Sequence, residues 1–425
     1  MTVTWARESR ESVVITSTGA ICALGNGVEE VMLAALEGSC GVRDCTSLLL
    51  TEGFGLAGVH RAALVDEPAA LVPATQASRA TRYALAAADE ALRSADLVVE
   101  TDDGGMALAG VDPDRVGVIT GTAAPAADMY FTISERVLGG DHDAVSGRTA
   151  PNLSAHAPAA AVALQYRLRG PNFAVSAACA TGALVVLAAA DQIRAGRADV
   201  IVAIAAESAV SAVGLASFAK ARALGTHCRP FDRDRNGLVF GEGAAAGIVE
   251  SAAHAAARGA APTATVRGGA LTNDAFHMWK PEVGSWARTM QLALQDADTA
   301  PVDIDYVCAH AAGTQVGDAC EVAALGKALG GRAEEVPVWS TKGMHGHVLG
   351  ASGAIEIVIA LNALRAGRVP QTVGLLEPAP DCDLDHVPDA GRPGRPGVVM
   401  KDSFGFGGTN CVLVLDVHAA GTASK

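Results

Sequence analysis

The sequence has few aromatic residues and a shortage of positive charge. Of its 425 residues only 4% are Phe, Trp or Tyr, and 46 acidic residues outnumber 32 Lys and Arg, which gives a formal net charge of −14. A surface that binds nucleic acid needs clustered positive charge, so this composition argues against DNA or RNA as a partner. An acidic partner would need a local basic patch, because the chain as a whole is acidic.

Long apolar runs are also missing. No run approaches the ~18 residues of a membrane span, and the best candidate, which starts at Ala183, is interrupted by Asp191, Arg194 and Arg197. The opening residues MTVTWARESRES do not have the charged and then apolar pattern of a signal peptide. We therefore expect no membrane span and a cytoplasmic protein.

Paired cysteines are absent. The nine cysteines are scattered and none belongs to a CxxC pair, which indicates reduced thiols rather than a disulfide framework or a zinc site. They stand at positions 22, 40, 45, 179, 228, 308, 320, 382 and 411.

Half of the residues are hydrophobic, and short apolar strands alternate with alanine-rich helical stretches. Strands are predicted at 13–22, 114–123, 173–179, 198–208, 305–310, 337–341 and 412–416, and helices at 80–95, 180–195, 286–296, 318–328 and 354–365. This alternation predicts an α/β fold. The alternation of predicted strands and helices is similar on both sides of residues 250–262, so we expect two duplicated halves, 1–255 and 256–425.

The segment SAACATGA (176–183) places Cys179 among small residues, where a predicted strand gives way to a helix. A helix N-terminus carries partial positive charge and favours a thiolate, which suggests a nucleophile with room for a substrate. The alternative is a small, inert core cysteine.

Three later segments also combine glycine with reactive groups. CAHAAGTQVGD (308–318) has His310 at a strand end. STKGMHGHVLGASGAIE (340–356) has Lys342, His345 and His347 in a glycine-rich turn and Glu356 on the helix that follows. SFGFGGTN (403–410) predicts a tight backbone turn in which the two phenylalanine side chains fill the space around the glycines. Taken singly, these segments have simpler explanations: a structural histidine, a solvated turn and a hairpin loop.

In this order the four segments resemble the successive signatures of β-ketoacyl-acyl-carrier-protein synthases, above all the synthase II type and the type II polyketide ketosynthase subunits. VITSTGAICALGNG, RPFDRDRNGLVFGEGAA, TNDAFHM and EPAPDCDLDHVP add to the likeness, which covers residues 13–415. The resemblance implies a thiolase-like fold: two duplicated α/β halves in five layers, αβαβα, assembled as dimers.

The resemblance also implies roles for individual residues. Cys179 would take the acyl chain, and His310 and His347 would serve decarboxylation of a malonyl unit. Lys342 would support His310 electrostatically, and Glu356 would hold Lys342. A Cys–His–His set suits a thioester that forms on sulfur while an enolate is stabilised by two N–H donors.

Further roles follow from the same resemblance. The backbone amides of Cys179 and Phe406 would form the oxyanion hole, and Phe404 and Phe406 would gate the acyl pocket. No metal or organic cofactor is expected, since the substrates would be carried on the 4′-phosphopantetheine of an acyl carrier protein. Cys308, two residues before His310 on the predicted strand, is a conceivable second thiol facing the same way.

The sequence departs from the family pattern along the expected pantetheine channel, which we assign to Thr314, Trp279, His277 and Ala312. A hydroxyl expected at 312 is replaced by Ala312, and a threonine expected after the His-Met of AFHM is replaced by Trp279. We expect a narrower, more apolar channel with altered carrier or extender preference; drift without consequence is the alternative.

Lys220 and Arg222 match a stretch that resembles the family's carrier-docking edge, although isolated surface cations are commonly just solvated. The expected partners are an acyl carrier protein and a second subunit, either another copy or a chain-length-factor-like protein. Two other functions stay open. One is an acyltransferase that loads Cys179 without decarboxylation, and the other is a non-catalytic partner subunit, which would normally lack the cysteine.

Overall fold

The computed structural model describes residues 11–46, 61–68, 77–388 and 391–420. Within these residues one mixed sheet of eleven strands runs through the molecule in the order β13-β12-β14-β15-β11-β1-β10-β9-β7-β8, with β2 (Gly25–Asn26) paired to β1. Two small sheets pair β3 (Val42–Asp44) with β4 (Arg61–Ala63) and β5 (Val98–Glu100) with β6 (Met106–Leu108).

The large sheet consists of two halves with the same pairing pattern. In each half two antiparallel pairs are followed by two parallel pairs, and β1 meets β11 where the halves join. The first half contains β1 (Val13–Cys22), β10 (Gly243–Ser251), β9 (Val200–Glu207), β7 (Val116–Gly121) and β8 (Asn172–Val175). The second contains β11 (Ala264–Asn273), β15 (Thr409–Val417), β14 (Val398–Phe404), β12 (Tyr306–Cys308) and β13 (Val338–Trp339).

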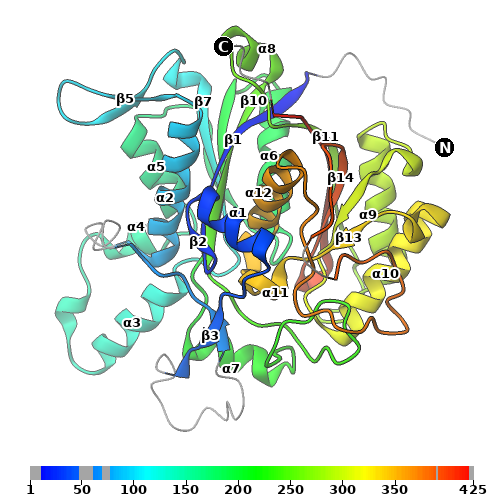
Figure 1. Cartoon of the computed structure of the whole chain (residues 1–425). Coiled ribbons are helices and arrows are strands. Elements are labelled where there is room, and N and C mark those ends of the chain that lie inside the picture. The colour runs from blue at the N-terminus through cyan, green and yellow to red at the C-terminus, as the bar shows by residue number, and fades with distance from the viewer. Residues whose placement is uncertain (1–10, 47–60, 69–76, 389–390, 421–425) are drawn as a thin grey trace.

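Two buried helices, α6 (Thr181–Arg194) and α12 (Ser352–Arg365), form the central layer between the two halves of the sheet (Figure 1). They approach closely where Gly182 faces the start of α12, because a Cβ on Gly182 would lie 2.5 Å from the backbone nitrogen of Ala354. Glycine at this crossing lets the two helix N-termini meet, which brings the segments in front of them to one place.

Outer helices complete the layers. The helices α2 (Arg79–Ser94) and α5 (Ala157–Tyr166) cover the first half, and α9 (Val283–Asp296) and α10 (Gln315–Leu329) cover the second (Figure 1). Each covering pair buries a hydrophobic cluster of its own against the sheet, and the largest cluster surrounds α6 and α12. The arrangement confirms the predicted five layers, αβαβα.

The remaining helices are short or peripheral. They are α1 (Val28–Glu37), α3 (Ala127–Leu138), α4 (Thr149–Leu153), α7 (Ala212–Lys220), α8 (Ala252–Ala257), α11 (Lys342–His345) and the 3-10 turns η3 (Pro113–Arg115), η4 (His142–Ala144), η5 (Pro301–Asp303), η6 (Gly330–Glu334), η7 (Leu349–Ala351) and η8 (Phe406–Gly408). None of the helices in the described ranges is long and apolar enough to cross a bilayer.

Every strand and helix expected from the sequence has a counterpart, but several strands end earlier than predicted, and two of these differences affect candidate site residues. The strand expected to reach Cys179 ends at Val175, and the strand expected to reach His310 ends at Cys308. Cys179 and His310 therefore lie in turns beyond the ends of these strands. In a turn, side chains do not alternate between the two faces of the sheet as they do in a strand. Side chains that follow strand ends in this way commonly form binding sites.

Candidate functional site

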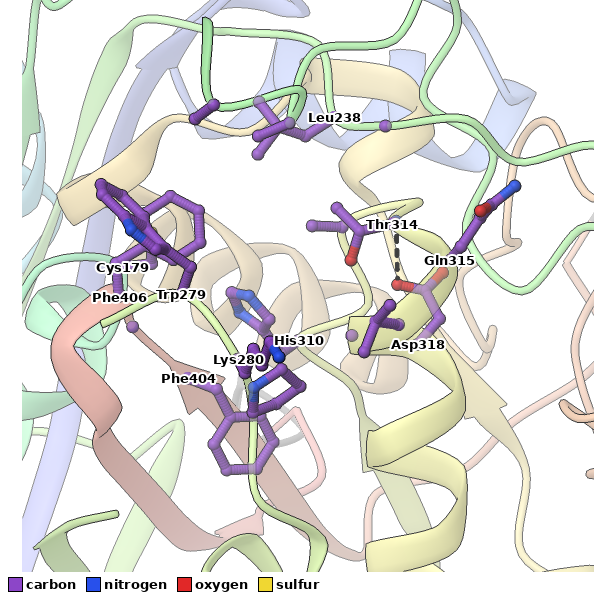
Figure 2. Close-up of a pocket in the computed structure, with 18 of the residues that line it drawn as sticks. Cys179, Leu238, Trp279, Lys280, His310, Thr314, Gln315, Asp318, Phe404 and Phe406 are labelled. Carbon is purple, nitrogen blue, oxygen red and sulfur yellow. Dashed lines mark hydrogen bonds between the residues drawn. The ribbon is translucent and has the colours of Figure 1, made fainter. Parts of the chain in front are cut away.

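A pocket of about 330 Å³ opens over the N-terminal ends of the central helices, and Cys179, His310 and His347 all line it. Its other walls include the glycine-phenylalanine loop, the segment after β11, the start of α10, the end of α7 and residues 236–238. Figure 2 shows Cys179, Trp279 and Phe406 on one side, Thr314 and Asp318 on the other, and His310 between them. Segments far apart in the sequence therefore share one cavity.

A strained turn presents Cys179 to this pocket. Ala178, just before it, has a φ of 46°, a left-handed conformation that is costly for a residue with a Cβ. The turn is held by the hydroxyl of Thr181, which accepts from the Ala177 amide at 2.8 Å and donates to the Ala178 carbonyl at 2.6 Å. Strain of this kind at a cavity commonly marks a functional residue.

The glycine-phenylalanine loop approaches this turn closely at Gly405. A Cβ on Gly405 would lie 2.9 Å from the Ala177 carbonyl oxygen and 3.2 Å from the Cys179 nitrogen, so only glycine fits without displacement. As a result the backbone N–H groups of Phe406 and Cys179 both interact with the sulfur of Cys179. Two amides at one sulfur are suitably placed for the oxygen of a thioester formed there.

Burial dominates the acidity of the thiol. The Cys179 side chain is 7% exposed, and burial raises the pKa of its thiol to about 12, against smaller lowering effects from the Lys342 ammonium and from the two amides. Cys179 is therefore a protonated thiol in the free protein at neutral pH.

The two histidines stand edge to face across the pocket. Their ring centroids are 5.4 Å apart with an interplanar angle of 77°. His310 follows β12, and His347 follows α11. Burial, and then the charge of Lys342, lowers the pKa of both rings, to about 3 for His347 and well below the ordinary value for His310. Both imidazoles are therefore neutral at pH 7 and each carries one N–H.

Two carboxylates of α10 hold the loop that carries His310. Glu321 accepts from the backbone amides of His310 and Ala311, each at 2.7 Å, and Asp318 accepts from those of Gly313 and Thr314, each at 3.2 Å. Both carboxylates are buried. Sequence reasoning missed them, although two acids three residues apart near a helix start were a visible signal for capping the preceding loop.

Lys342 is completely buried beneath the histidines. Its ammonium donates to the backbone carbonyl of His310 and to Oε1 of Glu356. A second buried lysine that the sequence did not single out, Lys401 of β14, lies 2.9 Å from Oε2 of the same carboxylate. Burial alone would raise the pKa of Glu356, but Lys342 and Lys401 together lower it to about 2.

Because two buried ammonium groups share Glu356, we expect Glu356→Gln to destabilise the protein more than Lys401→Met. The glutamine would leave two buried cations without a carboxylate, a loss of about 3–5 kcal/mol, whereas the methionine keeps the Lys342–Glu356 pair. Denaturant titrations of the two variants measure the difference. Equal losses would show that Lys342 and Lys401 do not depend jointly on this carboxylate.

All four residues assigned to the channel, Thr314, Trp279, His277 and Ala312, line the pocket. The Trp279 side chain is 57% exposed, and its ring packs edge to face on Phe406 with centroids 5.2 Å apart. The Nδ1 atom of His277 accepts from the amide of Trp279 at 3.0 Å, which holds the turn. The substituted tryptophan thus stands beside Phe406 at the outer part of the pocket.

The two aromatic residues assigned to the gate have different surroundings. Phe404 is buried and stacks on Trp286 with centroids 3.8 Å apart, and its centroid lies 5.9 Å from that of His310. Phe406 is only partly buried and contacts Phe218 and Trp279. Phe404 is therefore packed between Trp286 and His310 inside the protein, whereas Phe406 lies nearer the surface of the pocket.

The predicted docking cations are both exposed at the end of α7, but only Arg222 lines the pocket. Lys280, which follows Trp279, is exposed and lines the pocket as well. Positive charge at the mouth therefore comes from two segments, of which the sequence indicated one.

Cys308, the conceivable second thiol, does not share the pocket with His310. Its side chain is completely buried in the central hydrophobic cluster and does not line the pocket. The physical reason is that β12 ends at Cys308, so the two-residue alternation does not extend to His310. In the described part of the chain no group of three or more His, Cys, Asp or Glu residues could hold a metal ion.

Comparisons with known proteins agree with this geometry. The beta-ketoacyl synthase N-terminal domain matches residues 10–255, and the beta-ketoacyl synthase C-terminal domain matches residues 263–376. The 3-oxoacyl-(acyl-carrier-protein) synthase 2 of Coxiella burnetii is 35% identical over 415 residues, which cover 96% of this chain and 98% of that protein.

Solved structures are similar over the whole fold. The ishigamide ketosynthase/chain length factor has a TM-score of 0.87 and 34% identity, and the match covers 97% of this chain and 100% of that one. A type II PKS acyl-carrier protein in complex with its ketosynthase bound to the hexaketide gives a TM-score of 0.85 and 29% identity, covering 96% and 100%.

Proposed function

Because the chain belongs to the β-ketoacyl synthase family and is an acyltransferase-class enzyme, we propose that it extends a Cys179-bound acyl chain with malonyl-acyl carrier protein by decarboxylative Claisen condensation in type II polyketide synthesis. The observation that carries this proposal is the meeting of one thiol, two neutral imidazoles and two backbone amides in one pocket. Each of these groups has a task in the reaction.

In the loading step the sulfur of Cys179 attacks the carbonyl carbon of an acyl-pantetheine thioester. The amides of Cys179 and Phe406 donate to the oxyanion, the bond to the pantetheine sulfur breaks, and the proton of the Cys179 thiol leaves on the pantetheine thiol. Because the free thiol is protonated, attack and proton transfer are expected to be coupled, with a neutral imidazole available as the intermediate base.

In the second step the malonyl thioester occupies the same pocket with its carbonyl oxygen toward His310 and His347. Their N–H groups donate to this oxygen while the bond to the carboxylate breaks and carbon dioxide leaves, which produces an enolate. The enolate carbon then attacks the Cys179 thioester. The carbon–sulfur bond breaks, the β-ketoacyl product stays on the carrier, and the Cys179 thiolate that is released takes up a proton from solvent. The step balances without a metal or organic cofactor.

The choice of polyketide over fatty-acid synthesis is supported by two features. The similar solved structures carry the titles of an ishigamide ketosynthase/chain length factor and of a type II PKS ketosynthase bound to a hexaketide. The pocket also departs from the family pattern at Trp279 and Ala312, both of which line it. A changed channel suits a specialised set of acyl chains.

We further propose that the protein acts in the cytoplasm as a homodimer or as a heterodimer with a chain-length-factor-like subunit. The strand β8 is the last strand of the sheet, so one of its edges has no partner strand among the residues that the structure describes. Leu164 of α5, which lines the same surface hollow as Asn172 of β8, is 80% exposed. An open strand edge beside an exposed apolar side chain favours a subunit interface.

The carrier protein is proposed to bind where its pantetheine arm can enter the pocket. Arg222 and Lys280 supply positive charge at the mouth, and Lys220 lies next to Arg222 on the outside. An acidic carrier would be attracted to this edge although the enzyme as a whole is acidic.

Reconstitution with purified carriers tests the proposal. The chain, alone and with a chain-length-factor-like subunit, is incubated with an acyl carrier and a malonyl carrier, and mass spectrometry follows the carrier arm. The expected product is a β-ketoacyl carrier extended by two carbons with release of carbon dioxide. Acyl loading without any decarboxylation would point to an acyltransferase and overturn the proposal.

Trp279 offers a test of channel specificity. We expect Trp279→Thr, alone or with Ala312→Thr, to change the ratio of kcat/KM between two carriers by about 5-fold or more, because the ring forms part of the mouth and its apolar contacts are worth roughly 1–2 kcal/mol. Phe276→Thr is the matched control, since Phe276 is exposed in the same segment but does not line the pocket. If the ratio of kcat/KM between the two carriers is unchanged in the Trp279 variants, Trp279 does not determine carrier preference.

A further inference from the structure

Ser352 lies directly behind one of the two pocket histidines. It is the first residue of α12, its side chain is 1% exposed, and it does not line the pocket. Its hydroxyl oxygen is 2.8 Å from Nδ1 of His347 and accepts the backbone N–H of Val348 at 2.7 Å. Nδ1 is thus turned toward α12, which leaves Nε2 for the pocket.

The donors and acceptors around the Ser352 hydroxyl decide which ring nitrogen of His347 carries the hydrogen. A serine hydroxyl has one O–H and two lone pairs, and the Val348 amide uses one lone pair. If Nδ1 carried the hydrogen it would donate to the other lone pair, and the buried O–H would then need an acceptor. Among the described residues no other acceptor lies within hydrogen-bonding distance of this hydroxyl. That arrangement leaves a buried donor unpaired, which proteins avoid.

The alternative arrangement satisfies every group. The Ser352 O–H donates to a bare Nδ1, and the ring carries its single hydrogen on Nε2. We propose that Ser352 is a positioning residue that holds His347 as the Nε2–H tautomer, so that this ring is a hydrogen-bond donor in the pocket. The role of this tautomer in decarboxylation rests on the proposed function. The assignment of the tautomer itself is independent of that function.

The backbone around His347 is fixed well enough for this role. The amide of His347 donates to the Val239 carbonyl at 2.6 Å, and the amide of Gly350 donates to the buried carboxylate of Glu207 at 3.2 Å. Between them Leu349 has a φ of 42°, a tight turn that brings Ser352 back onto the ring. The hydroxyl therefore meets Nδ1 in a rigid setting, as the control of a tautomer requires.

A merely structural role is the competing explanation, because the bond from Val348 to Ser352 also closes the turn before α12. The two roles make different predictions. Loss of the turn would reduce stability alone, whereas loss of the O–H donor would also let the hydrogen of His347 move to Nδ1. A measurement of the ring nitrogens separates them.

The experiment compares 15N-histidine-labelled wild-type protein with Ser352→Ala, Ser352→Thr and His347→Gln, the last to assign the signal. In solid-state 15N spectra a bare ring nitrogen resonates far downfield of an N–H nitrogen. We expect a bare Nδ1 and a protonated Nε2 for His347 in the wild type, a mixture of tautomers in Ser352→Ala, and the wild-type pattern in Ser352→Thr. Ser285→Ala is the matched control, a buried serine in the first turn of α9 outside the pocket.

Kinetics supply the second readout. Carbon dioxide release from a malonyl carrier should fall about 10- to 100-fold in kcat for Ser352→Ala, with a much smaller change in KM, and recover in Ser352→Thr. A protonated Nδ1 in the wild type, or an unchanged tautomer in Ser352→Ala, overturns the inference. If the tautomer shifts as expected while even the wild type releases no carbon dioxide, Ser352 keeps its role and the proposed function fails instead.

Discussion

Replacing Cys179 with alanine is expected to abolish acyl loading, with a loss of condensation of about 1000-fold or more. Cys179 is the one cysteine among the described residues that lines the pocket, so no other thiol there can take the acyl group. The change removes a single sulfur atom from a site already packed with small side chains, so the fold should persist.

Intact-protein mass spectrometry after incubation with an acyl carrier checks this result. The wild type should gain one acyl group, and Cys179→Ala should gain none. Cys40→Ala is the matched control, because Cys40 is an exposed thiol outside the pocket and its loss should leave loading intact. An acyl adduct that survives in Cys179→Ala would place the nucleophile elsewhere.

The second large effect concerns the two imidazoles. We expect His310→Ala and His347→Ala each to reduce carbon dioxide release from a malonyl carrier by about 100- to 1000-fold, since each removes one donor to the enolate oxygen. The double variant should lose less than the product of the single losses, because the two donors act on one oxygen. Acyl loading of Cys179 should be reduced much less.

The pH dependence gives an independent check. The pKa of His347 is lowered to about 3 and that of His310 lies well below its ordinary value, so both rings stay neutral as the pH falls through 6.5. Between pH 7 and pH 5 the kcat of decarboxylation should therefore change by less than about 3-fold. A loss of rate with an apparent pKa near 6.5 would show that a ring is ordinary only if it were not caused by Glu321 or Asp318, because burial raises the pKa of these two carboxyl groups to about 7 and about 6.

His345→Gln serves as the control for both tests. His345 is buried two residues from His347, and its Nε2 pairs with the hydroxyl of Thr341 at 2.8 Å, but it does not line the pocket. Its replacement should affect stability more than decarboxylation. If it reduced carbon dioxide release as strongly as His347→Ala, the assignment of the histidine pair would be wrong.

These two results also separate the functions that the sequence left open. An acyltransferase without decarboxylation would load Cys179 and release no carbon dioxide from any malonyl carrier. A non-catalytic partner subunit would do neither, although it could still bind a second chain. Loading at Cys179 together with histidine-dependent decarboxylation belongs to the condensing enzyme alone.

The sequence by itself determined the class of fold, and its resemblance to a known family pointed to the candidate reactive residues. Alternation of apolar strands with alanine-rich helices follows from local periodicity, and small residues around Cys179, His310 and His347 stand out without coordinates. Strand ends were less certain, because a turn such as that at Ala178 depends on contacts with Thr181 and Gly405 rather than on its own sequence.

Only the tertiary structure decided which groups meet and in what state. The sharing of Glu356 by Lys342 and Lys401, the capping of the His310 loop by α10, and the contact of Ser352 with His347 all depend on side-chain direction and distance. The same is true of the protonated Cys179 thiol, whose pKa is set by how deeply the pocket buries it. Desolvation and pairing are properties of a folded interior, and a linear sequence does not contain them.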